Sequence, residues 1–167
     1  MTDVSALVEQ LLAENDPTDR EAFMRAQFAM GLAWVHFPEG KGGLGLAPRV
    51  QHDVDAALGA AGAPLPRFVD VIGHGMGAPT LLAHGTEEQH SRYLEPLFTG
   101  EEIWSQLFSE PGAGSDVAGL ATRAIKDGDE WVVSGQKVWT TVAHLSKWGM
   151  VVTRTDPDVP KHLGMTY

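Results

Sequence analysis

The sequence has no cysteine among its 167 residues, which excludes disulfide bonds, thiolate metal sites and thiol catalysis. It also has no apolar run near the roughly 20 residues that a membrane-spanning helix needs. The first residues, Met1 to Asp3, lack the basic and then apolar order of a secretion signal. Together these absences predict a cytoplasmic protein with no membrane-spanning segment.

Basic residues are scarce, with 12 Lys and Arg against 22 Asp and Glu, for a net charge of −10. The excess of acid is even: residues 1–83 carry 10 acids and 5 bases, and residues 84–167 carry 12 and 7. Binding to nucleic acid or to an anionic membrane needs clustered basic residues. The charge pattern therefore argues against both kinds of partner.

Side chains with the spacing of common catalytic or metal sites are also missing. No two of the seven histidines follow an H-x-H or H-x-x-x-H pattern, so the sequence predicts no metal site. A hydrolase nucleophile at Ser115 is disfavoured because the G-x-S-x-G turn is incomplete there. The adjacent acid pairs Glu87/Glu88 and Glu101/Glu102 diverge in a regular element and are expected to be solvated.

The composition changes near residue 103. Val, Ile and Thr number 13 in residues 1–102 and 16 in residues 103–167, and four of the five tryptophans lie in the second part. β-Branched and aromatic residues favour strands. The predicted fold class is α+β: an all-helical N-terminal domain, 1–102, followed by part of an antiparallel β-barrel-like domain, 103–167.

Apolar periodicity and capping residues place the expected helices of the first domain. A capping box from Thr18 to Glu21 is expected to open the second helix. The glycine-rich stretch 37–45 is expected to be a loop, and glycines in the fourth helix suggest close approach of another helix or a ligand. The helices are expected over residues 4–12, 19–30, 50–61, 67–84 and 87–97.

Four strands are expected from residue 103 onward. Asp127-Gly128-Asp129 separates residues 121–126 from 130–134, which is a strong hairpin pattern. Further strands are expected over residues 103–109 and 150–155.

Two segments of the second part carry candidate chemistry. Ser109 to Asp116 is rich in small residues, so a planar cofactor or a phosphate could approach its backbone, although a simple tight turn explains the same residues. Val117 breaks the dinucleotide pattern G-x-G-x-x-G. Trp139-Thr140-Thr141 could cover a flat ring with an indole and a hydroxyl, whereas a tryptophan at a strand end more commonly belongs to the core.

Four ordered motifs together resemble the acyl-CoA dehydrogenase family. WSQLFSEPGAGSD (104–116) and GQKVWTT (135–141) resemble its two flavin-binding segments. PEGKGGLG (38–45) resembles its glycine loop, and PTLLAHGTEEQ (79–89) resembles a pattern of its helical domain. The resemblance extends from about residue 30 to residue 167.

This resemblance implies FAD as cofactor and assigns roles to individual residues. Gln106, Phe108 and Ser109 would line the pyrimidine side of the flavin through backbone and hydroxyl contacts. Gly114 and Ser115 would follow, with Ser115 near the FAD phosphates and the entrance for the acyl-CoA pantetheine. Trp139 would pack beside the ring with Thr140 next to it, and Thr141 would place its hydroxyl near N5. Ser109 stands where Thr is commoner and Thr140 where Ile is.

The implied activity is α,β-dehydrogenation of an acyl-CoA thioester to the trans-2-enoyl product. The family also implies electron-transfer flavoprotein as acceptor and a homo-oligomer in the full-length form. Its catalytic carboxylate lies in a C-terminal domain, beyond residue 167, so no catalytic residue is assigned here and this chain alone is expected to be inactive. A non-catalytic truncated paralogue that binds a partner subunit or an acyl ligand is the alternative.

Overall fold

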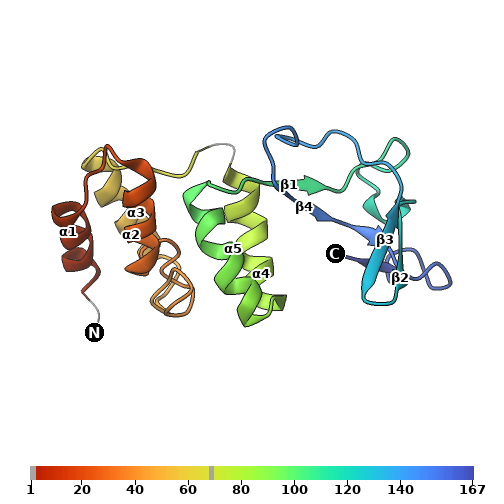
Figure 1. Cartoon of the computed structure of the whole chain (residues 1–167), viewed down its shortest axis with the longest axis horizontal. Helices are drawn as coiled ribbons and strands as arrows, with labels where there is room; N and C mark the ends of the chain where they lie inside the picture. Colours follow the sequence, from red (N-terminus) through yellow and green to blue (C-terminus); the bar gives the residue numbers. More distant parts are fainter. Residues whose placement is uncertain (1–2, 68–69) are drawn as a thin grey trace. The chain divides into compact units, whose positions relative to one another are not determined.

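The computed structural model describes residues 3–67 and 70–167, and the chain divides into two compact units, Met1–Ile103 and Trp104–Tyr167 (Figure 1). The first unit is built from helices and the second from strands. No helix among the described residues is long and apolar enough to cross a membrane. The helical elements are α1 (Val4–Glu14), α2 (Arg20–Ala29), α3 (Val50–Ala60), the π-helical turn η2 (Gly73–Gly77), α4 (Ala78–His84) and α5 (Glu87–Thr99).

The core of the first unit lies among α1, α2 and α3. Leu11, Phe23 and Leu58, one from each helix, are fully buried and belong to one apolar cluster. Val35 adds a side chain from the segment between α2 and α3. The core thus forms where the apolar stripes of these helices meet, as their periodicity predicts.

Local capping defines two of the helix starts. Asp19, and not Thr18, is the N-cap of α2, with its carboxylate accepting the N–H of Ala22. The capping box expected from Thr18 is therefore wrong, because the Thr18 hydroxyl is bonded to Asp16 instead. Thr86 is the N-cap of α5, and its reciprocal bonds with Gln89 form a capping box.

The helix expected over residues 67–84 is partly described. Positions 68 and 69 lie outside the described residues, and α4 covers the last turns. Between them, Gly73–Gly77 widens into η2, whose first and last glycines are buried. This turn contacts α4 and α5. Packing within the helical unit is therefore consistent with glycine at positions 73 and 77, whereas Gly75 is exposed and a Cβ there would meet nothing within 4 Å.

Six strands form two sheets in the second unit. One sheet pairs β1 (Trp104–Leu107) with β4 (Trp148–Val151) in parallel. The other has the order β3-β2-β5-β6. Its strands are β2 (Arg123–Asp127), β3 (Glu130–Ser134), β5 (Thr153–Arg154) and β6 (Met165–Thr166).

The strand directions in the second unit are mixed. The expected hairpin is confirmed as an antiparallel β2–β3 pair with Gly128 at φ 60° in its turn. β5 and β6 are also antiparallel, whereas β2 pairs with β5 in parallel. The single strand expected over 150–155 is split at Val152 between the two sheets. A strand that changes sheets can connect them without a long crossover.

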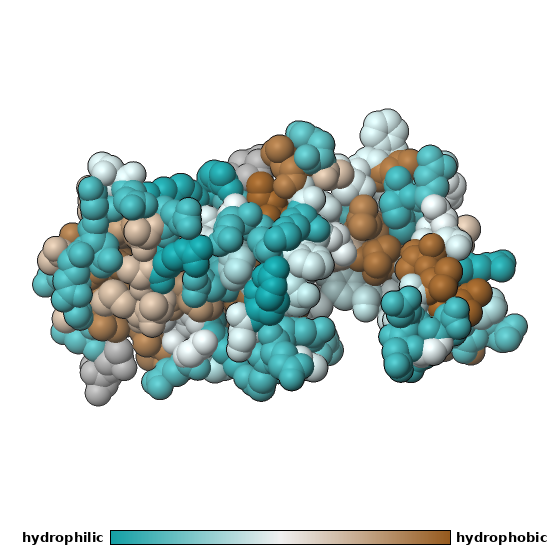
Figure 2. Space-filling model, in the orientation of Figure 1, coloured by the Kyte–Doolittle hydropathy of each residue, from teal (hydrophilic) through white to brown (hydrophobic). Residues whose placement is uncertain are grey.

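The β2–β3 hairpin carries apolar side chains on its surface. Ile125 and Val132 are opposite each other and more than half exposed, and Trp131 and Val133 are about half exposed on the other face. Figure 2 shows hydrophobic surface over the strand unit. Exposed apolar side chains on an edge strand favour association with other chains.

Candidate functional site

The two segments that sequence analysis selected lie against each other in the second unit. The N–H of Val138 donates to the carbonyl of Ser109 at 2.9 Å. The Lys137 ammonium donates to the carbonyl of Phe108 at 3.0 Å. The segment after β1 and the segment after β3 therefore form one continuous surface, although 27 or more residues separate the partners in sequence.

Glu110 joins this surface to the start of β2. Its carboxylate accepts the N–H groups of Ala121 at 2.7 Å and Thr122 at 2.9 Å, and the Lys137 ammonium at 2.9 Å. Burial alone would raise the pKa of Glu110, but the hydrogen bonds from Thr122, Ala121 and Lys137 outweigh burial and lower this pKa to about 2. Glu110 is thus a carboxylate with its charge compensated inside the fold.

The loop that follows Glu110 is closed by backbone hydrogen bonds at its start, whereas its glycines have open space around them. Glu110 and Ala113 exchange two backbone hydrogen bonds, at 2.8 and 3.1 Å. A Cβ added at Gly112 or Gly114 would meet nothing within 4 Å, and Ser115 is exposed. Two of the predicted site residues, Gly114 and Ser115, therefore lie on an exposed loop with accessible backbone.

Basic side chains hold the far end of this loop. Arg154 of β5 donates to the carbonyls of Ala118 at 2.7 Å and Leu120 at 3.4 Å, around the 3₁₀ turn η3 (Val117–Gly119). Lys161 pairs with Asp116 at 2.7 Å on the surface. The loop is consequently supported on both sides.

Trp139 projects from the second segment. Its side chain is 90% exposed and its backbone has a left-handed φ of 58°. Thr140 is half-buried and Thr141 is exposed. The interpretation of Trp139 as a core residue is wrong, because an indole so exposed packs against little of its own chain. Val142 shares the left-handed conformation with φ 56°, which is rare for a β-branched residue.

The remaining predicted residues contribute in different ways. Gln106 is half-buried on β1, opposite Met150. Phe108 packs against the apolar cluster of Ala113, Leu120 and Val152. The carbonyls of Phe108 and Ser109 are bonded within the chain, so their contacts to a ligand would come from N–H groups or from the Ser109 hydroxyl.

Sequence analysis did not assign a role to three residues that build this site. Glu110, Lys137 and Arg154 each connect segments distant in the sequence. A charged residue inside a glycine-rich motif was the available indication for Glu110 and Lys137. Nothing local indicated Arg154, because its partners are carbonyl groups.

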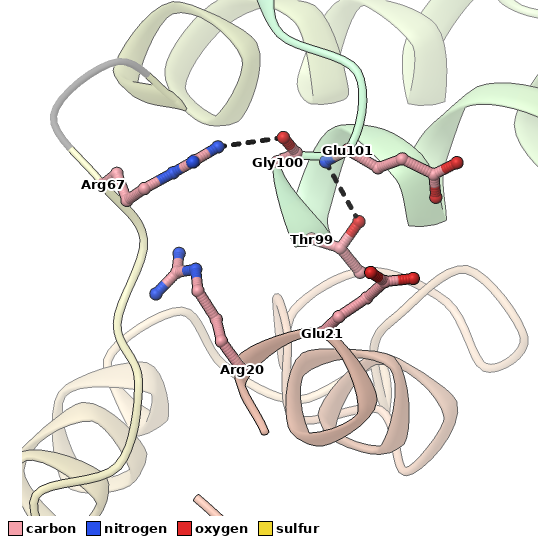
Figure 3. Close-up of a pocket in the computed structure, with 6 residues that line it drawn as sticks. All are labelled: Arg20, Glu21, Arg67, Thr99, Gly100 and Glu101. Carbon is pink, nitrogen blue, oxygen red and sulfur yellow. Dashed lines mark hydrogen bonds between the residues drawn. The ribbon is translucent and has the colours of Figure 1, made fainter. Parts of the chain in front are cut away.

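A separate charged pocket of about 200 Å³ lies in the helical unit (Figure 3). Arg67 donates to the carbonyl of Gly100 at 2.9 Å, so it holds the end of α5. Glu21 and Glu101 both contact Arg25, at 3.2 and 2.6 Å. These charges are paired within the chain, which indicates a structural junction. The pocket is lined by Arg20, Glu21, Arg67, Thr99, Gly100 and Glu101.

The part of the chain that the structure describes holds no cluster of three or more potential metal-ligating side chains. Loop backbone, exposed hydroxyls and an exposed indole remain as the chemistry of the site around Ser109 and Val138. Such groups suit a flat, polar-edged ligand better than an ion.

Comparison with known sequences places both units in one family. Residues 2–101 match the family described as acyl-CoA dehydrogenase, N-terminal domain, and residues 105–167 match its middle domain. Acyl-CoA dehydrogenase FadE34 of Mycobacterium tuberculosis is 47% identical over 137 residues, which cover 82% of this chain and 19% of FadE34. Acyl-CoA dehydrogenase IpdE1 of the same organism is 43% identical over 149 residues, covering 89% of this chain and 38% of IpdE1.

Solved structures agree with the sequence matches. The Tcur3481-Tcur3483 steroid ACAD aligns with a TM-score of 0.66 at 29% identity, covering 96% of this chain and 44% of that one. The ChsE4-ChsE5 complex from Mycobacterium tuberculosis gives 0.65 at 29% identity, covering 96% and 43%. A glutaryl-CoA dehydrogenase from Mycobacterium smegmatis in complex with FADH2 gives 0.58 at 26% identity, covering 92% and 42%.

The chain thus spans less than half the length of these relatives. The matches nevertheless cover nearly every residue of the chain itself, and they run through the two segments that meet at Ser109 and Val138. The chain belongs to the acyl-CoA dehydrogenase family, of which it carries the N-terminal and middle domain regions.

Proposed function

We propose that this chain forms the helical and flavin-facing parts of an FAD-dependent acyl-CoA dehydrogenase. Residues 1–102 are assigned to the helical domain and residues 103–167 to part of the middle domain. The observation that carries the proposal is the Ser109–Val138 junction, which brings both flavin-type segments together and presents Trp139 outward. The glutaryl-CoA dehydrogenase relative, which holds FADH2, supports the choice of cofactor.

The residues present suit FAD. An exposed indole can cover one part of a flat ring system, and a left-handed backbone at such a position is typical of a functional constraint. The open backbone at Gly112 and Gly114 leaves room for a phosphate near Ser115. We assign Gln106, Phe108 and Ser109 to the pyrimidine edge, Gly114 and Ser115 to the phosphates, and Trp139, Thr140 and Thr141 to the ring.

The proposed reaction is the conversion of an acyl-CoA thioester to the trans-2-enoyl-CoA. Bound FAD supplies the acceptor for the hydride that leaves the β-carbon, while a carboxylate takes the α-proton. In this chain, N–H and hydroxyl donors at Ser109 and Thr141 would stabilise negative charge at the ring edge. Ser115 would also border the path of the pantetheine.

We assign the proton-abstracting carboxylate to a region of the whole enzyme outside residues 1–167. The most buried acid of the site, Glu110, is fully hydrogen-bonded to Lys137, Ala121 and Thr122, and its lowered pKa makes it a poor base. Further proposals are a cytoplasmic location, electron-transfer flavoprotein as acceptor and an oligomeric enzyme. The named two-component relatives, Tcur3481-Tcur3483 and ChsE4-ChsE5, support assembly from several chains.

Titration of the purified chain with FAD tests the cofactor site. We expect weak, saturable quenching of flavin fluorescence, since the chain spans only part of its relatives. Trp139→Ala should weaken binding about tenfold, which corresponds to about 1.4 kcal/mol of ring contact. Trp131→Ala is the matched control, because it removes another exposed tryptophan outside the proposed site.

Three outcomes would contradict parts of this proposal. Equal FAD affinity of the Trp139→Ala variant and the unmodified chain would remove Trp139 from the site. A complete lack of saturable binding would contradict the flavin assignment. Acyl-CoA dehydrogenation by the chain alone, measured with an artificial electron acceptor, would show that the carboxylate base lies within residues 1–167.

A further inference from the structure

We propose that the ion pair between Glu110 and Lys137 positions residues 135–141, which we call the ring-binding segment. The pair fixes Lys137–Thr141 against Phe108 and Ser109, and thereby determines where Trp139 projects. This inference rests on the proposed function in one respect, namely that these two segments face the flavin. The contacts themselves are properties of the chain and can be tested with no cofactor present.

The Lys137 side chain contacts two residues of the other segment, Phe108 and Glu110, which lie on either side of Ser109. Its ammonium lies 3.0 Å from the carbonyl oxygen of Phe108 and 2.9 Å from Oε1 of Glu110. The next residue, Val138, donates its N–H to Ser109 at 2.9 Å. Three bonds to three adjacent residues determine both the distance and the register between the segments.

Burial distinguishes this pair from an ordinary surface contact. The side chains of Lys137 and Glu110 are 8% and 7% exposed, whereas those of Lys161 and Asp116 are 59% and 61% exposed. Exposed ion pairs hold geometry weakly because water competes for both charges. Water does not compete for the charges of a buried pair. Removing one partner therefore leaves an uncompensated buried charge, which is strongly unfavourable.

The segment needs an external support. Residues 135–147 lie outside the helices and strands of the described chain. Trp139 and Val142 both have left-handed backbones, a conformation that persists only where surrounding contacts enforce it. The contacts of Lys137 and Val138 immediately precede Trp139, so they are placed to enforce its conformation.

Glu110 extends the support to a third segment. Its remaining acceptor positions take the N–H groups of Ala121 and Thr122, which lead into β2. A Cβ on Gly135 would lie 2.3 Å from Oγ1 of Thr122, so the start of the ring-binding segment also packs closely there. The Glu110 carboxylate therefore connects its own loop to the start of the hairpin and to the ring-binding segment.

Amide hydrogen exchange and fluorine NMR on the 167-residue chain test this role. The chain is labelled with 5-fluorotryptophan, and Trp139→Phe identifies the Trp139 resonance. In Lys137→Met we expect exchange at the Val138 amide to accelerate at least about tenfold and the Trp139 resonance to move, while the β2–β3 amides stay protected. Lys137→Arg keeps a cation and should retain most of the protection. Lys161→Met, which breaks the exposed pair, should leave both signals unchanged.

Two results would overturn the proposal. Unchanged Val138 exchange and an unmoved Trp139 resonance in both Lys137→Met and Glu110→Gln would show that the pair does not position the segment. Loss of protection across all of Trp104–Tyr167 would show that the pair supports the whole unit. Failure of the proposed flavin binding is measured separately, by the FAD titration, and does not alter the exchange result.

Discussion

The backbone N–H of Thr122 donates to Oε1 of Glu110 at 2.9 Å, across twelve residues of sequence. With Ala121 and Lys137, it surrounds the carboxylate with donors that favour its charged form. The β2–β3 hairpin and the loop that follows β1 are therefore linked through a carboxylate whose ionised form these donors stabilise.

Acidification should destabilise the strand unit through Glu110. Its folded pKa of about 2 lies below its ordinary value of 4.5. The resulting stabilisation, about 3 kcal/mol, is complete above the unfolded pKa and is lost as the pH falls through the folded one. Urea unfolding at several pH values between about 7 and about 2, followed by tryptophan fluorescence, measures it. Glu110→Gln should flatten this part of the profile, and an unchanged profile would contradict the assignment.

Alanine should lower the free energy of unfolding when it replaces a helix cap, such as Thr86, and should have little effect at Thr18, which is not a cap. Thr86→Ala removes the acceptor for the N–H of Gln89 and should lower the free energy of unfolding by about 1 kcal/mol. Asp19→Ala should cost a similar amount, because Asp19 is the N-cap of α2. Thr18→Ala is the control and should stay within about 0.5 kcal/mol. A larger effect at Thr18 than at Asp19 would restore the capping box that the structure rejects.

Alanine should have opposite effects at two glycines of the helical unit. A Cβ on Gly43 would lie 2.1 Å from the carbonyl oxygen of Phe37, so Gly43→Ala should destabilise by about 1–3 kcal/mol. Gly59 lies within α3 with open space around it, so Gly59→Ala should stabilise by about 0.5–1 kcal/mol. Thermal unfolding of the two variants compares them directly, and equal shifts in Tm would contradict the packing of the glycine loop.

Protonation of His74 should oppose folding of the helical unit. Burial lowers the pKa of His74, although Asp70 and the carbonyls of Phe98 and Leu97 act in the opposite direction. A folded pKa below the ordinary value of 6.5 means that stability is present above about pH 6.5 and decreases as the pH falls. NMR titration of the His74 ring locates the folded pKa. His74→Phe should reduce the pH dependence, and a ring that titrates above 6.5 would reverse the sign.

Local patterns were sufficient for much of the fold. The helices around Leu11 and Leu58 and the hairpin turn at Gly128 all follow from interactions within a few residues. The capping box at Thr18 failed because two neighbouring residues, Thr18 and Asp19, can each cap, and the pattern does not rank them. Parallel pairing of β1 with β4 joins residues more than forty positions apart, for which no local pattern exists.

By itself, the sequence determined the family and the two segments that carry the candidate chemistry, because their glycines, hydroxyls and indole are contiguous in the chain. Only the tertiary structure decided that Glu110 and Lys137 join those segments and that Trp139 projects from them. The physical reason is distance along the chain. A buried charge takes its partner from whichever segment the fold brings near, and the exposure of an indole depends on what packs around it.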